Sequence, residues 1–332
     1  MIFSERAVGA SIGTILGHSV RLPDGGRIGK GTLIDVEQID ALQRAGILHV
    51  TVAELEPMDV GEDQAAEAVA RAIVPAPKDA NLKLTRAHSG RVNLVATAPG
   101  IVGLDAAALT ELNALDESVT VATLPQYQRV MAGDLAATIK IIPFAVTRSI
   151  LSHACEIARG SLRVRGVKVR TASLFETVID GDVRGNKGEA ATRERLARLG
   201  MDLIQTELVP HDAEALAEAL VAAQGDIILI LTASATVDRA DTAPRALEMA
   251  GGEVTRFGIP VDPGNLLFAG HMGAAPVIGL PGCARSPALN GADWVLERLV
   301  CGVPITDRDI AMMGVGGLLK DVVARGAPRR ID

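Results

Sequence analysis

Short apolar runs alternate with amphipathic segments along the second half of the chain. The runs that predict strands cover residues 163–175, 201–210, 226–233 and 276–282. The segments whose apolar residues recur at helical spacing cover residues 188–200, 212–225, 243–252 and 290–302. Strands that alternate with helices of this length form βαβ units, in which neighbouring strands run parallel. The pattern therefore predicts an α/β domain with a mostly parallel sheet over residues 161–325.

The first half mixes the two kinds of pattern without a regular alternation. The predicted helices cover residues 35–46, 61–74, 105–115 and 145–160. The predicted strands cover residues 47–55, 91–98, 119–125 and 137–146. In the first helix, Asp35 suits the N-cap and Gly46 suits the position just past the end. We predict a mixed α+β region over residues 1–160, whose function the pattern does not indicate, and a boundary near Ser161.

One lysine interrupts an otherwise apolar strand, Lys140 in "ATIKIIPFAV". Two interpretations are equally open. Its aliphatic stem packs on the sheet and its ammonium group reaches water, or its ammonium group faces a cleft between the two halves of the chain.

The composition excludes several classes of protein. The chain has 332 residues, a net charge of −7 and 48% hydrophobic residues, of which few are aromatic. Without a basic run or an aromatic cluster, we expect no nucleic-acid partner. The apolar runs are too short to span a membrane, and the first residues contain no apolar core of a signal peptide. Three cysteines without CxxC spacing predict neither a disulfide scaffold nor a zinc site, and we expect a cytoplasmic protein.

The loops that follow the predicted parallel strands carry the candidate chemistry. In an open parallel sheet, ligands bind beyond the C-terminal ends of the strands. The segment "ILILTASATVDRADTAP" places small residues and hydroxyl groups after a buried strand, which lets backbone N–H groups approach a phosphate. Carboxylates in these loops can accept from amino groups of a ligand or hold Mg²⁺. Each loop is also explained as an ordinary polar turn, and neither GxGxxG nor GxxxxGK[ST] is present.

Two segments resemble a known family. "DIILILTASATVDRADTAPRALEMAGGEV" resembles the central motif of the molybdopterin-binding domain of molybdenum-cofactor biosynthesis proteins, with Thr232, Asp241 and Pro244 at the motif positions. "PVDPGNLLFAGHMGAAPVIGLPGCARS" is similar to the paired proline-glycine turns of the molybdenum-insertase branch. Residues 163–299 carry the specific resemblance, and residues 28–47 carry a weak one. The glycine-rich turn of the family is replaced by "ASAT", and Cys283 and Ala284 replace an asparagine and a proline.

The resemblance implies a three-layer α/β/α domain that holds a pterin with a dithiolene and a terminal phosphate. The residues expected to contact the cofactor are Thr232, Ser234, Ala235, Thr236, Asp238, Asp241, Asp182, Pro281, Gly282, Cys283, Arg285 and Ser286. We expect a protein that binds molybdopterin or finished molybdenum cofactor and serves in its biosynthesis, maturation or delivery.

Two alternatives stay open. In the first, the chain is a Mg·ATP-dependent adenylyltransferase or molybdenum insertase, in which Asp241 and Asp212 act with Mg²⁺. In the second, it is a regulatory module that binds a nucleotide or sugar phosphate. Expected partners are a molybdoenzyme or a nucleotidyltransferase, and a second copy of the chain in a homo-oligomer.

Overall fold

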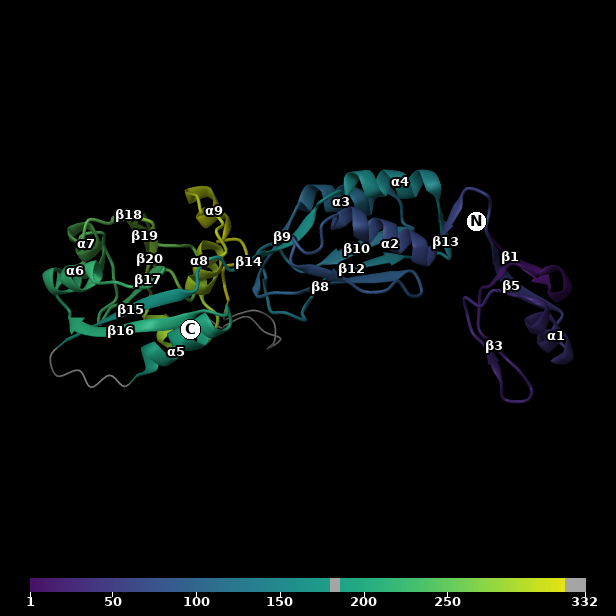
Figure 1. The fold of residues 1–332 in the computed structure, drawn as a ribbon, viewed down its shortest axis with the longest axis horizontal. Coiled ribbons are helices and arrows are strands. Elements are labelled where there is room, and N and C mark those ends of the chain that lie inside the picture. The colour runs from purple at the N-terminus through teal and green to yellow at the C-terminus, as the bar shows by residue number, and fades with distance from the viewer. Residues whose placement is uncertain (180–185, 320–332) are drawn as a thin grey trace, which may run out of the picture. The chain divides into compact units, whose positions relative to one another are not determined.

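The computed structural model describes residues 1–179 and 186–319. The chain forms two compact units (Figure 1). Unit 1 comprises residues 1–98 and 102–164, and unit 2 comprises residues 99–101 and 165–332. Within the described residues, no helix is long and apolar enough to cross a membrane.

Unit 2 is built on one six-stranded sheet with the order β16-β15-β17-β20-β19-β18. Its strands are β15 (Thr171–Val178), β16 (Asp202–Pro210), β17 (Ile227–Leu231), β18 (Glu253–Phe257), β19 (Phe268–Met272) and β20 (Ala275–Leu280). β15, β16, β17 and β20 pair in parallel, which confirms the predicted α/β class. The two strands that the sequence did not predict, β18 and β19, pair antiparallel at one edge.

Helices cover both faces of this sheet (Figure 1). They are α5 (Lys187–Ala197), α6 (Ala213–Val221), α7 (Thr242–Met249) and α8 (Gly291–Val300), followed by α9 (Asp307–Met312). α6 and α7 share a buried apolar cluster with alternate sheet residues such as Phe175, Ile228 and Ile230. Because neighbouring strand residues point to opposite faces, the fully buried Leu229 and Leu231 point toward the layer that contains α5 and α8. The arrangement is the predicted three-layer one.

The predicted strand over residues 163–175 is wrong as a single element. The structure has two strands there, β14 (Leu162–Gly166) and β15, and they belong to different sheets. β14 pairs with β9 (Gly100–Leu104), so its partner lies far away in the sequence. A Cβ atom on Gly100 would lie 2.2 Å from the carbonyl oxygen of Arg165, so only glycine allows this approach.

The larger part of unit 1 is a four-stranded sheet with the order β10-β12-β8-β7. Its strands are β7 (Leu82–Leu84), β8 (Arg91–Ala96), β10 (Val119–Thr123) and β12 (Leu135–Ile141), and β11 (Arg129–Val130) belongs to the sheet of β9 and β14. Its helices are α2 (Glu62–Ile73), α3 (Ala106–Leu115) and α4 (Arg148–Ile157). The helix predicted from residue 145 begins at Arg148, because β13 (Ala145–Thr147) instead pairs with β6 (Asp59–Gly61).

The first residues of unit 1 form a three-stranded sheet with the order β1-β5-β2 and a small hairpin. The elements are β1 (Ile2–Ala7), η1 (Val8–Ala10), β2 (Ile15–Leu16), β3 (Val20–Arg21), β4 (Arg27–Ile28), α1 (Val36–Arg44) and β5 (His49–Glu54). Asp35 caps α1 in a reciprocal capping box with Gln38, and Gly46 follows the helix at φ +71°, as predicted.

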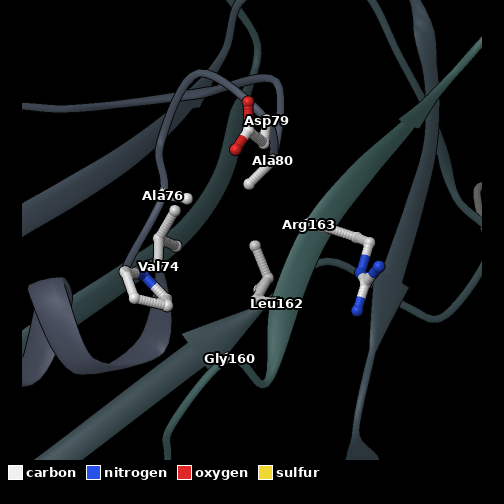
Figure 2. Close-up of a pocket in the computed structure, with 8 residues that line it drawn as sticks. Val74, Ala76, Asp79, Ala80, Gly160, Leu162 and Arg163 are labelled. Atoms are coloured by element: carbon white, nitrogen blue, oxygen red, sulfur yellow. The ribbon is translucent and has the colours of Figure 1, made fainter.

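A small hollow of about 170 Å³ lies in unit 1 (Figure 2). Its lining residues are Val74, Pro75, Ala76, Asp79, Ala80, Gly160, Leu162 and Arg163. Figure 2 shows the Arg163 side chain pointing away from Val74 and Ala76. The lining is mostly apolar, and we treat the hollow as a packing feature.

Candidate functional site

The C-terminal ends of three parallel strands define one rim of the unit 2 sheet. Glu176 and Thr177 lie near the end of β15, and Thr232 follows β17. Pro281 follows β20 and leads into the short helix η2 (Gly282–Arg285). Because the three strands are parallel, their exits meet at the same edge. We call this edge, with residues 176–177, 232–236 and 281–286, the sheet rim.

Arg285 ties the three strand exits together. Its Nη1 lies 2.8 Å from Oε2 of Glu176, and its Nη2 donates to the carbonyl oxygen of Thr232 over 3.1 Å. The Glu176 side chain is 9% exposed, so this ion pair is mostly shielded from water. Two of the predicted residues, Thr232 and Arg285, are therefore in direct contact.

The side chain of Thr177 contacts the loop after β17, and two amides of that loop have no acceptor among the described residues. Oγ1 of Thr177 accepts from the Ala233 amide over 2.8 Å and lies 2.8 Å from Nδ1 of His211. Oγ1 of Thr232 donates to the carbonyl oxygen of Ser234 over 2.6 Å. Ser234 and Ala235 are exposed, and their amides donate to no acceptor among residues 1–179 and 186–319. Free backbone amides at a strand end are donors that an anion can use.

The third segment of the rim is fixed by a buried arginine on α5. Nε of Arg195 lies 2.8 Å from Oδ1 of Asp293 in α8, and the two side chains are 2% and 3% exposed. The remaining guanidinium nitrogens of Arg195 donate to the carbonyl oxygens of Ala284, Ser286 and Ala288. The conformation of the loop after β20 therefore depends on Arg195, although Arg195 itself does not reach solvent.

Two of the predicted aspartates, Asp241 and Asp212, are helix N-caps. Oδ1 of Asp241 accepts from the Thr242 amide over 2.7 Å, and Oδ2 accepts from the Val237 amide over 3.1 Å. Asp238 accepts from the Ala240 amide. Asp212 caps α6 through the amides of residues 214 and 215. No ion pair or hydrogen bond among the described residues joins Asp212 to Asp241, and the same residues contain no group of three or more His, Cys, Asp or Glu that could hold a metal.

The other predicted residues occupy different positions around the rim. Gly282 borders open space, because a Cβ atom built on it would meet nothing within 4 Å. Cys283 and Ser286 are exposed, and Nδ2 of Asn290 lies 3.9 Å from the sulfur of Cys283. Thr236 and Pro281 are buried. Asp182, the remaining prediction, lies outside the described residues.

Three residues that organise the rim, Glu176, Thr177 and Arg195, are not among the residues predicted from the sequence. Glu176 and Thr177 end an apolar strand, where a carboxylate is unusual enough to have served as a signal. Arg195 follows the buried Ala191 by one helical turn on α5, so its spacing indicates a charge on the buried side of the helix.

The comparisons with known proteins concern mainly unit 2. The model of a family described as a probable molybdopterin binding domain matches residues 176–299. A domain of unknown function matches residues 5–54. Among curated proteins, no relative of this chain is found.

Several solved structures are similar to the chain. A molybdopterin biosynthesis MoeA protein from Pyrococcus horikosii is 14% identical, with 95% of this chain and 77% of that chain covered and a TM-score of 0.29. The molybdopterin biosynthesis enzyme MoaB from Thermus thermophilus is 20% identical, with 46% and 99% covered and a TM-score of 0.26. TM-scores this low carry no argument about function. The family match does not depend on these structures: residues 176–299, which include the strand exits, match the model of a probable molybdopterin binding domain.

Proposed function

We propose that the sheet rim of unit 2 binds molybdopterin or the finished molybdenum cofactor, and that the chain serves in the maturation or delivery of that cofactor. The observation that carries the proposal is the pair of free, exposed amides of Ser234 and Ala235, in the loop whose Thr232 carbonyl oxygen accepts from the Arg285 guanidinium. The family match over residues 176–299 supports the pterin as ligand.

The rim fits the terminal phosphate of such a ligand. Phosphate oxygens accept hydrogen bonds from backbone amides and pair with guanidinium groups, and these charge-assisted bonds are stronger than neutral ones. Side chains at the rim are short at Ser234 and Ala235, and Gly282 borders open space, so a phosphate has room to approach. The dithiolene of the bound pterin would supply the two sulfurs that hold molybdenum.

The charges at the rim favour binding and release over catalysis. Asp241 and Asp212 each accept from backbone amides, so a metal would compete with those hydrogen bonds. Glu176 already neutralises Arg285, and a ligand phosphate must compete with it. Such competition weakens the binding of an anion, which suits a protein that hands the cofactor on.

The test is the cofactor content of the full-length protein after purification from a host that makes molybdopterin. We expect a fluorescent pterin to be released on oxidation, in an amount that approaches one per chain. Protein that carries no pterin and takes up none when molybdopterin is added would contradict the proposal. Turnover of Mg·ATP that is lost in Asp241→Asn would show an enzyme instead.

A further inference from the structure

A separate cavity of about 790 Å³ lies in unit 1. Its lining residues are Lys30, Gly31, Thr32, Glu62, Asp63, His88, Ser89, Arg91, Lys140, Ile142 and Phe144. Most of these residues come from the start of α2, from the turn between β7 and β8, and from the end of β12, elements that lie against one another (Figure 1). The family that matches unit 2 does not extend to any of them.

One wall of the cavity is a tight turn. His88 and Arg91 exchange two backbone hydrogen bonds of 3.1 Å, and Ser89 and Gly90 between them adopt φ +49° and +68°. Two consecutive residues with positive φ form the turn that matches the twist of a hairpin. Oδ1 of Asp63 accepts from the Gly90 amide over 2.7 Å, which fixes the turn to α2. The wall is therefore held in place without any ligand.

Lys140 completes that wall. Its Nζ donates to the carbonyl oxygen of Ser89 over 2.7 Å and lies 3.4 Å from Oε2 of Glu62. A Cβ atom on Gly90 would lie 2.6 Å from the same Glu62 oxygen and 2.8 Å from Nζ, so the ion pair packs directly on the turn. Neither sequence-based interpretation of Lys140 foresaw this contact, because the turn and α2 are far from it in the sequence.

The lining carries more positive than negative charge. Lys30, Arg91 and Lys140 face the two carboxylates of Glu62 and Asp63. Lys140 pairs with Glu62, but the exposed Arg91 guanidinium has no acceptor among the residues that the structure describes. Nζ of Lys30 lies 5.3 Å from the centre of the Phe144 ring, a contact that does not cancel its charge. Two cations thus remain available in a chain whose net charge is −7.

We propose that this cavity binds a small organic phosphate, with the phosphate beside Arg91 and Lys30 and with hydroxyl or amino groups of the ligand beside Asp63 and Glu62. A free inorganic ion would leave most of the volume empty, whereas ligand sites of roughly 300–1,000 Å³ hold molecules of nucleotide size. Carboxylates repel a bare oxyanion, but they accept hydrogen bonds from the sugar or base of an ester. This ligand is independent of the pterin proposed for unit 2.

The test uses the full-length chain at low salt, with calorimetric titration of AMP, ribose 5-phosphate, inorganic phosphate and adenosine. We expect AMP or ribose 5-phosphate to bind, and inorganic phosphate and adenosine to bind at least about tenfold more weakly, because each lacks one half of the contacts. Arg91→Gln should weaken the organic phosphate about tenfold or more. Arg86→Gln, which removes another exposed charge from the same hairpin but outside the cavity lining, should not.

Arg285→Gln at the sheet rim serves as the second control and should leave this affinity unchanged, which separates the cavity from the unit 2 site. Absence of binding by both organic phosphates would overturn the proposal. The proposal would also be overturned if inorganic phosphate or adenosine bound as tightly as the organic phosphates. An equal loss of affinity in Arg91→Gln and Arg86→Gln would overturn it as well. Thermal melting of the Arg91 and Arg86 variants, with an unchanged midpoint expected because both residues are exposed, shows that a loss of binding is not a loss of fold.

Discussion

The sheet rim of unit 2 and the cavity of unit 1 both offer donors to an anion, but with different chemical groups. At the rim the donors are the backbone amides of Ser234 and Ala235, and the Arg285 guanidinium is already paired with Glu176. In the cavity the available donors are the long side chains of Lys30 and Arg91.

This difference determines what each site depends on. Amides in a fixed loop lose no side-chain entropy on binding, so the rim depends on the groups that hold the loop. Exposed cations lose side-chain freedom, and salt screens their attraction to a ligand. The rim should therefore be sensitive to buried substitutions, and the cavity to surface substitutions and to ionic strength.

The largest expected effect is on stability, at the buried arginine that supports the rim. Arg195→Met leaves Asp293 charged and without its partner at 3% exposure. Removing one partner of a buried ion pair costs about 3–5 kcal/mol of unfolding free energy. Trp294, the single tryptophan, lies in α8, so its fluorescence during denaturant unfolding reports on unit 2.

The matched control is Arg193→Ala, two residues away on the same helix. Its partner Glu189 is an i,i+4 neighbour, and both are partly exposed. Such a pair contributes about 0–1 kcal/mol. Equal unfolding midpoints for the Arg195 and Arg193 variants would show that Arg195 does not hold the rim.

The next effect concerns ligand affinity at the rim. Arg285→Gln removes a charge-assisted hydrogen bond to the ligand phosphate, worth about 1.5–3 kcal/mol, or roughly 10–200-fold in affinity. The measurement is the fluorescence titration of apo protein with an oxidised phosphopterin. Arg170→Gln is the control, because Arg170 is exposed at the opposite edge of the sheet, just before β15. A similar loss in both variants would indicate general charge attraction rather than a site at the rim.

A smaller change in ligand affinity, of opposite sign, is expected from a substitution at Glu176. Glu176→Gln removes the carboxylate that competes for Arg285, so phosphopterin should bind a few-fold more tightly, most clearly at low salt. Glu218→Gln, an exposed residue of α6, changes the net charge equally and should leave the affinity unchanged. Weaker binding in Glu176→Gln would mean that Glu176 contacts the ligand instead of competing with it.

The smallest expected effect is a pH dependence of the unfolding free energy, caused by Asp226 at the edge of the sheet opposite the rim. The Arg170 amide, the Thr171 hydroxyl and the Thr171 amide donate to Asp226 and hold its pKa below the usual value. A lowered folded-state pKa stabilises the fold above the unfolded pKa of about 4, and this contribution is lost as pH falls through the folded pKa. Asp226→Asn should therefore be less stable than wild type near neutral pH, by about 1 kcal/mol or less because the site is exposed.

The two unfolding curves should converge as pH falls below the lowered folded-state pKa of Asp226, because the carboxyl is then protonated in both states. A stability difference that stays constant from neutral pH into acid would show that charge is not the cause. Phosphopterin affinity at neutral pH should be the same in both proteins, because Asp226 is not at the rim.

Local signals in the sequence predicted most of the helices and one part of the site. Asp35, Asp212 and Asp241 each precede a helix that they cap, because capping involves residues close in sequence. The convergence of Thr232 and Arg285 followed from the rule that parallel strands end at one edge. The parallel part of the sheet could be predicted for the same reason, since each strand is followed by its own helix.

Non-local pairing explains what the sequence did not predict. β14 and β15 lie in one stretch with a strand-like pattern but join different sheets, and Ala145–Thr147 precedes a helix but pairs with β6. Arg195 and Asp293 are 98 residues apart, and only the packing of α5 near α8 makes them partners. The unit 1 cavity likewise combines α2, a turn and β12, which no local pattern connects.

The central claim is that the rim recognises the phosphate of a pterin, and the most direct test compares one pterin with and without that phosphate. Apo protein is titrated with an oxidised phosphopterin and with the same compound after phosphatase treatment. We predict that the phosphorylated form binds at least about tenfold more tightly and that Arg285→Gln removes most of this preference. Equal affinity of wild type for the two forms would contradict the account.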